Sequence, residues 1–442
     1  MNMRPLFLTL SLLALCTVAH AAPALNSRPN AAYTLYLNFD GFSYTGTWGN
    51  TGKTPGNVPA YTGNDTQLRE IWARTAEKYA AFDVNVTTVD PAIAAGQAGS
   101  ALARQNYYDN TPRVMHTVIG GSNGWYGGGG GVSYVGVASG SFPGGYKTNW
   151  VFPANLGFSP KIIAEASAHE IGHAFGLDHQ GDNTGNTGQS NEYSSNGGSV
   201  GNGSYAPIMG NSYSSQRGAW RVGTTSTTTT VQNDVQTIFS NNGMSLINDG
   251  VGKSFATATA LPMAGPVVDS AAALAGGVIM PTSGSSADPI GINNYTKNYY
   301  RFSLGASSLI SLTVNSGADW ITPGTVAVGG TLRSRLNIYS AGNLISALGV
   351  GTEAIDTLST TFSGTLAAGD YFAEITSFGG FPSAFDSTAR YYDMGSYTLS
   401  GSGFAPVAAP EPGTISLLLL PGLGLLIRRR RVTGPSVGSL AR

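Results

Sequence analysis

Residues 169–179 read HEIGHAFGLDH, and this stretch constrains the fold more than any other part of the chain. Side chains four positions apart lie on one face of a helix, so a helix here lets His169 and His173 bind one metal ion, with Glu170 beside them. Gly176 tolerates a left-handed backbone and can end the helix, which returns His179 toward the same ion. The sequence therefore predicts a helix with two ligands and a tight turn that brings a third.

Three histidine nitrogens are a typical donor set for zinc sites that keep a fourth position open. A bare His-Glu-x-x-His pattern also occurs by chance on ordinary amphipathic helices. Here the glycine and the third histidine extend the pattern, and three of the five His residues of the chain fall inside residues 169–179. We therefore predict Zn²⁺ bound by His169, His173 and His179, with Glu170 as the general base.

The extended motif resembles that of the metzincin zinc endopeptidases, in its matrixin-type form. Residues 206–213, APIMGNSY, resemble the methionine turn beneath the zinc of that family, with Met209 as its key residue. The resemblance implies peptide-bond hydrolysis, in which zinc acidifies a water and Glu170 passes its proton to the leaving amine. In some metzincins a tyrosine two positions after the methionine approaches the zinc. That position is Asn211 here, so Tyr213 is the candidate for stabilising the oxyanion.

Strand and helix signals alternate along the segment before the motif. Strands are expected at residues 33–40, 84–89 and 113–119, and a helix at residues 66–80 capped by Asp65. The motif helix is expected to begin near Pro160, and a closing helix is marked by Val231, Val235, Ile238 and Phe239. The alternation and the resemblance together predict an α+β fold, with a metzincin-like catalytic domain at residues 22–250 built on a mixed twisted sheet.

Three features near the motif have competing interpretations. The glycine run 127–131 and the alternating residues 132–137 occupy the place before the motif helix where metzincins have an edge strand that pairs with extended substrate. The resemblance therefore implies such a strand here, and glycine allows the close backbone approach it needs; a flexible surface loop is the alternative. His116, in a predicted strand, could be a further metal ligand, but it is expected to be satisfied within the sheet because the motif already supplies three ligands. Glu165, four residues before His169, could orient that side chain, but it is expected to be solvated.

The segment 180–205 is long and almost wholly polar, so it needs something to order it. Asp182, Asn183 and Asn191 offer oxygen ligands that suit Ca²⁺, although their spacing matches no defined calcium loop. A structural calcium ion is therefore a second, weaker metal prediction.

The sequence pattern changes to short alternating apolar runs after residue 250, which predicts a second domain at residues 251–405. Short alternating runs occur at residues 299–304, 309–314, 336–339, 371–376 and 397–400. Such strands with Gly-rich turns are typical of an all-β sandwich. Their order resembles the bacterial pre-peptidase C-terminal domain, and the segment contains no nucleophile, acid pair or ligand cluster. We therefore expect a binding or spacing role for it.

The two ends of the chain are typical of export signals. Residues 1–21 have a basic start, an apolar run and a small-x-small end, which predicts a signal peptide and places the only cysteine, Cys16, inside it. Residues 406–442 resemble a PEP-CTERM sorting signal, with Pro410-Glu411-Pro412, a short apolar run and Arg428 to Arg431. The resemblance implies recognition by an exosortase-type enzyme and an exported protein of a Gram-negative bacterium, secreted or on the cell surface, with only a transient membrane anchor. A plain tail anchor is the alternative, and eleven residues follow the arginines where the signal normally ends.

The net charge of the chain bears on whether its partner is a nucleic acid or a protein. Without the two predicted signals the chain keeps 17 basic and 23 acidic side chains, a net charge of −6. A mildly acidic body disfavours nucleic acid, and the motif implies protein or peptide substrates. The competing class is a non-catalytic surface or matrix adhesin in which the zinc site is vestigial or structural and the sandwich carries the function.

Overall fold

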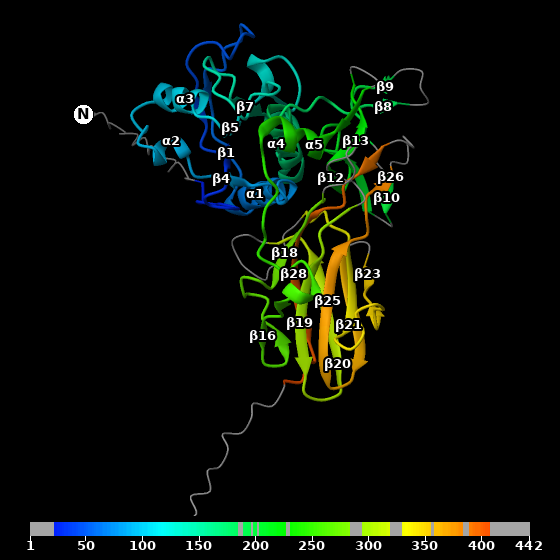
Figure 1. Ribbon diagram of the computed structural model, residues 1–442. Helices are drawn as coiled ribbons and strands as arrows, with labels where there is room; N and C mark the ends of the chain where they lie inside the picture. Colours follow the sequence, from blue (N-terminus) through cyan, green and yellow to red (C-terminus); the bar gives the residue numbers. More distant parts are fainter. Residues whose placement is uncertain are drawn as a thin grey trace, which may run out of the picture. The chain divides into compact units, whose positions relative to one another are not determined.

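The computed structural model describes residues 22–183, 189–195, 198–200, 203–226, 230–282, 294–318, 329–354, 358–382 and 389–406. The predicted signal peptide with Cys16 lies outside the described residues, as does the predicted sorting tail from residue 407 onward. The fold is mixed α+β, with most regular structure in strands (Figure 1). In the described part of the chain, no helix combines the length and the apolar character that crossing a membrane requires. The described residues from 22 to 406 belong to one compact unit.

A five-stranded sheet is the centre of the first half of the chain. Its strands are Tyr33–Asn38 (β1), Val84–Thr87 (β4), Val114–Ile119 (β5), Gly131–Val132 (β6) and Thr148–Val151 (β7). The order is β4-β1-β5-β7-β6; the first four strands in this order run parallel, and β6 pairs antiparallel with β7 at the edge. The last glycine of the run and Val132 therefore form a short edge strand.

Helices cover both faces of this sheet. They are Asp65–Lys78 (α1), Pro91–Ala94 (α2), Ala101–Asn110 (α3) and Pro160–Ala174 (α4). Successive side chains of a strand point to opposite faces, so Leu35 and Leu37 of β1 join the core that contains α1 and α4, whereas Tyr36 packs with Tyr108 of α3. Because α4 packs against both α1 and the sheet, all its residues from Ile163 onward are buried.

Several predicted boundaries were wrong by one to three residues; strand β1, for example, ends at Asn38 rather than at residue 40. The cap of α1 is Asn64, whose side chain accepts a hydrogen bond from the Gln67 amide at 3.0 Å, while the Gln67 side chain accepts one from the Asn64 amide at 3.0 Å. Asn64 has the extended backbone that a cap requires, so Asp65 becomes the first helical residue. Strand β4 ends at Thr87, two residues earlier than expected.

Four small sheets are also present in the described residues, and three of them contain strands from the segment that follows the motif. Their strands are Phe42–Ser43 (β2), Asn57–Val58 (β3), Asp182–Asn183 (β8), Gln189–Asn191 (β9), Gly198–Val200 (β10), Gly203–Pro207 (β11), Arg217–Ala219 (β12), Arg221–Thr224 (β13), Val231–Asn233 (β14), Phe381–Pro382 (β26) and Arg390–Tyr391 (β27). The closing helix, Asp234–Asn242 (α5), starts later than predicted because Val231 pairs with Thr224 across β13 and β14. Asn233 caps it.

Two larger sheets form the second half of the described chain. Their strands are Thr259–Ala260 (β15), Asn298–Leu304 (β19), Gly369–Ser377 (β25), Ser334–Ser340 (β21) and Gly349–Val350 (β22) in one, and Met263–Ala264 (β16), Val267–Val268 (β17), Gly395–Ser402 (β28), Ser308–Ser316 (β20), Ser359–Leu366 (β24), Thr352–Ala354 (β23) and Gly276–Ile279 (β18) in the other. Both sheets contribute to one apolar core, as in a β-sandwich. All five expected strands are present, and β24 was missed because Phe362 and Leu366 are its only large apolar residues.

Candidate metal centre

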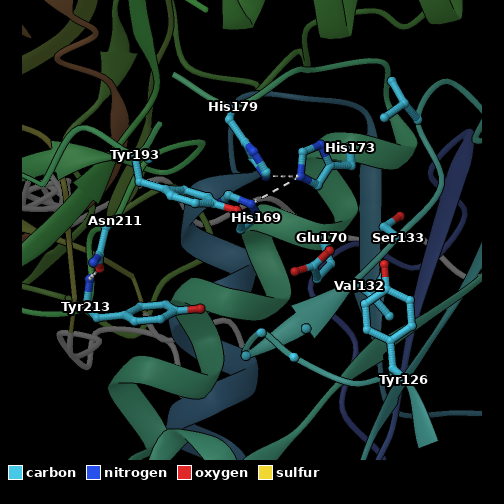
Figure 2. A pocket seen from close by; sticks show the side chains of 16 residues that line it. Tyr126, Val132, Ser133, His169, Glu170, His173, His179, Tyr193, Asn211 and Tyr213 are labelled. Carbon is cyan, nitrogen blue, oxygen red and sulfur yellow. Dashed lines mark hydrogen bonds between the residues drawn. The ribbon is translucent and has the colours of Figure 1, made fainter. Parts of the chain in front are cut away.

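The end of α4 presents the motif as the sequence predicts. Gly176 has φ of +98°, and its amide donates to the carbonyl of His173 at 2.8 Å. The amide of Leu177 donates to the carbonyl of Gly172 at 3.1 Å. These two bonds define a Schellman motif, which turns the chain sharply at a left-handed residue. The turn brings His179 back over the last turn of the helix (Figure 2).

The three motif histidines converge on one point (Figure 2). The Nε2 atom of His173 lies 3.1 Å from Nε2 of His169 and 2.9 Å from Nε2 of His179. One ring nitrogen from each histidine lies within 4.8 Å of the other two, and no other group of three or more His, Cys, Asp or Glu side chains in the described residues is arranged to hold a metal ion. The structure therefore brings together all three predicted ligands.

Hydrogen bonds on the far side of the His169 and His173 rings determine which nitrogen of each ring presents a lone pair to the point where the three histidines converge. Nδ1 of His169 donates to the carbonyl of Ile208 and Nδ1 of His173 donates to the carbonyl of Leu177, each at 2.7 Å. A neutral imidazole with hydrogen on Nδ1 has an unprotonated Nε2. Burial lowers the pKa of His169 well below its usual value and that of His173 to about 4, so both rings are neutral at pH 7.

Lone pairs on facing nitrogens cannot hydrogen-bond to each other, whereas one cation placed between them can bind all three. A first-row divalent ion accepts neutral imidazole nitrogens, and three such donors suit Zn²⁺ with one position open. The donor set therefore fits the predicted zinc ion.

Glu170 lies beside the histidines on the wall of a cleft of about 560 Å³. Its side chain is buried, and burial raises its pKa well above the usual value for a carboxyl group. A Cβ atom on Gly131 of edge strand β6 would lie 2.6 Å from Glu170 Oε1 and 2.8 Å from the Trp150 carbonyl oxygen. Only glycine at that position lets the edge strand pass this close to the carboxylate.

Met209 lies beneath the helix, fully buried. Its sulfur occupies the space where a Cβ atom of Gly172 would be, so the helix and the turn pack in direct contact. The carbonyl of Met209 accepts a hydrogen bond from the Gln180 amide at 2.8 Å, directly after His179. The predicted turn residue thus supports the segment that carries the third histidine.

Tyr213 and Asn211 both line the cleft. The Tyr213 hydroxyl lies 2.8 Å from the position that a Cβ on Gly130 would take, and burial raises the pKa of Tyr213, which keeps its hydroxyl protonated. Lys161 donates from Nζ to the carbonyl oxygens of Ser212 and Tyr213. The first residues of α4 thereby hold the Tyr213 backbone in place.

The prediction that Glu165 is solvated was wrong. Its side chain is buried and lies 3.1 Å from Lys78 Nζ and 3.7 Å from Lys161 Nζ. It also accepts hydrogen bonds from the Ser212 hydroxyl at 2.8 Å and the Gly218 amide at 3.2 Å. Burial acts to raise the pKa of Glu165, but the two lysines outweigh it and lower the pKa. Glu165 joins α1, α4 and the residues after Met209.

His116 is satisfied within the sheet, as expected. It is fully buried, with Nε2 2.9 Å from Asn38 Nδ2 and Nδ1 3.2 Å from Thr148 Oγ1. It stacks on Tyr36 with ring centroids 5.4 Å apart. It takes no part in the metal centre.

The weaker calcium prediction stays a prediction. Asp182 is buried, and its Oδ1 atom has no hydrogen-bond partner among the residues that the structure describes. The side chains of Asn183 and Asn191 lie outside what the structure describes.

Sequence reasoning missed two residues that contact His179. Oε1 of Glu192 lies 3.1 Å from Nδ1 of His179, and the Tyr193 ring packs on the His179 imidazole with centroids 4.4 Å apart (Figure 2). Both belong to the long polar segment, whose composition gives no periodic signal. The one local hint is that Glu192-Tyr193 interrupts a run of Gly, Asn, Ser and Thr.

Comparisons with known proteins give little beyond a distant likeness. No family model matches the chain, and no curated protein matches it. Among solved structures, the pre-peptidase C-terminal domain of a Bacillus anthracis collagenase matches at 10% identity over 28% of this chain and 85% of that chain, with a TM-score of 0.18. The Aeromonas hydrophila periplasmic inhibitor of g-type lysozyme, PliG, matches at 12% identity over 33% of this chain and 94% of that chain, with a TM-score of 0.19. Scores this low are not evidence of a shared fold.

Proposed function

We propose that this protein is an exported zinc-dependent endopeptidase of the metzincin type. The observation that carries the proposal is the convergence of three neutral histidine nitrogens beside a buried carboxylate, on the wall of an open cleft. Zinc held by His169, His173 and His179 would supply Lewis acidity for a water and for the scissile carbonyl. Its three protein ligands leave a position open for that chemistry.

Glu170 is the group that moves protons in this proposal. Glu170 would take a proton from the attacking water and give it to the leaving amine nitrogen. Burial raises the pKa of its carboxyl group above the usual value, which makes the carboxylate a stronger base. The products are a carboxylate and an amine, so one water is consumed for each peptide bond broken. The Tyr213 hydroxyl is a hydrogen-bond donor for the carbonyl oxygen as it gains charge.

The edge strand and the cleft lining indicate how the substrate binds. Within the described part of the chain, strand β6 pairs with β7 alone, so its other edge can accept an extended peptide. Apart from Glu170 and the three ligands, the residues that line the cleft are uncharged: Tyr126, Gly128, Gly129, Gly130, Gly131, Val132, Ser133, Val135, Tyr193, Gly210, Asn211 and Tyr213. We therefore expect uncharged residues on either side of the cleaved bond.

The test is cleavage of a diverse peptide mixture by the purified protein, with new termini identified by mass spectrometry. The proposal predicts cleavage between uncharged residues, loss of cleavage after zinc removal with a chelator, and recovery when Zn²⁺ is restored. Intact peptides in the presence of a full complement of zinc would overturn the proposed activity. Cleavage that survives complete zinc removal would overturn the proposed mechanism.

The localisation and the tail belong to the same proposal. Residues 1–21 would direct export, and residues 406–442 would be recognised by an exosortase-type enzyme and removed, with the protein finally secreted or on the cell surface. The sequence patterns at the two ends support this. Comparing the mass of the mature protein from exosortase-positive and exosortase-deficient cells tests it, since only the former should lose the tail.

A further inference from the structure

The loop that contains Glu192 and Tyr193 is anchored next to the metal centre. The Ser194 amide donates to the carbonyl of Gln180 at 2.8 Å, and the Asn211 amide donates to the carbonyl of Ser194 at 2.8 Å. A Cβ atom on Gly210 would collide with that same Ser194 carbonyl. Residues 192–194 are therefore fixed between the residue after His179 and the residues after Met209.

This anchoring brings a carboxylate to the far side of the third ligand. Nδ1 of His179 donates to Glu192 Oε1 at 3.1 Å, while the corresponding atoms of His169 and His173 donate to backbone carbonyls. A carboxylate bound to the second nitrogen of a metal-ligating imidazole orients the ring and makes the ligating nitrogen more basic. His179 lies beyond the end of α4, so the helix does not set the direction of its ring. Tyr193 packs on the same ring at an interplanar angle of 47°.

We propose that Glu192 is a positioning residue of the zinc centre, which holds His179 with hydrogen on Nδ1 and strengthens Nε2 as a ligand. This inference rests on the proposed zinc site. The Glu192 side chain is 61% exposed, so water weakens its effect. We therefore expect a loss at the low end of the range that such outer partners show, about tenfold in zinc affinity.

The experiment measures zinc affinity of the full-length protein by competition with a chromophoric chelator at pH 7.5. Glu192→Ala should bind zinc about tenfold more weakly than wild type, and Glu192→Gln, which keeps an acceptor but loses the charge, should lie between them. The unfolding temperature of the zinc-free protein should be unchanged in both variants, because the carboxylate is exposed. Glu70→Gln, which removes another surface carboxylate paired with Arg74, is the matched control and should match wild type.

A double-mutant cycle separates positioning from a general effect. In a His179→Ala background, Glu192→Ala should cause no further loss of zinc affinity, because the ligand that Glu192 positions is gone. The same tenfold loss in both backgrounds would overturn the inference, as would wild-type affinity in Glu192→Ala. If the wild-type protein itself holds no zinc, the proposed function fails and this inference fails with it.

Discussion

Gly131 lies directly against the carboxylate of Glu170, with no room for a single added carbon between them. The edge strand of the central sheet and the proposed general base are therefore in contact, and the strand that would bind a peptide also fixes the side chain that would act on it. This contact links substrate placement to catalysis through one backbone position.

Replacing Gly131 with alanine tests this contact. The new Cβ would lie 2.6 Å from Glu170 Oε1, so either the carboxylate or the strand must shift. We expect kcat/KM for peptide cleavage to fall by about a hundredfold, the scale of loss that a displacement of about 1 Å causes, with zinc content unchanged. Gly128→Ala is the control, because a Cβ there meets no atom within 4 Å. Equal activity in the two variants would show that the contact is unimportant.

Removing the Tyr213 hydroxyl tests its role as a hydrogen-bond donor. Tyr213→Phe keeps the ring, and the backbone remains held by Lys161. We expect kcat to fall at least tenfold with little change in KM or in zinc content, because a donor to the developing oxyanion acts only in the transition state. Tyr126→Phe, in another tyrosine of the same cleft, should retain most activity. A rise in KM with kcat unchanged would instead assign Tyr213 to substrate binding.

The sequence could predict the parts of the centre that depend on local geometry. His169, His173 and the return of His179 follow from helix periodicity and from one glycine, which indeed has φ of +98°. Glu165 was misjudged because its partner Lys78 belongs to α1, far away in sequence, and only the packing of two helices makes that position buried. Glu192 was missed for a similar reason, since its place depends on a loop anchored at Gln180 and Asn211.

In the rest of the fold, too, the sequence predicts the elements that have a local pattern and misses those that depend on contacts with distant residues. The five expected strands of the second half carry alternating apolar residues, whereas β24 has Ser, Thr and Gly at most positions and is held by pairing with β20 and β23. Val231 was expected in a helix but lies in β14, because Thr224 pairs with it. Pairing with neighbouring strands therefore makes β14 and β24 strands, against or without a local sequence signal.

A buried carboxyl group remote from the centre gives a prediction for stability against pH. Glu77 of α1 accepts hydrogen bonds from the backbone and hydroxyl of Ser396, and burial raises its pKa from 4.5 to about 7. The folded protein then binds more protons than the unfolded chain between these values. The contribution of Glu77 to stability is therefore complete below pH 4.5 and is lost as the pH rises through about 7.

Glu77→Gln cannot ionise and should remove this dependence. The pKa shift corresponds to a loss on the order of 3 kcal/mol in the wild-type free energy of unfolding between pH 4.5 and pH 8. Urea unfolding of wild type and variant at pH 5 and pH 8 measures the difference, and the variant should lose less stability over this interval. Identical losses would show that Glu77 does not titrate as its burial indicates.

The most direct test of the zinc endopeptidase compares wild type with Glu170→Ala, measuring zinc content and peptide cleavage on the same purified samples. Glu170 is not among the three ligands, so the variant should hold the same single zinc ion. We predict one zinc per chain in both proteins and cleavage by wild type alone, with the variant reduced by at least a hundredfold. Zinc in both proteins with equal cleavage, or with none from either, would contradict the account.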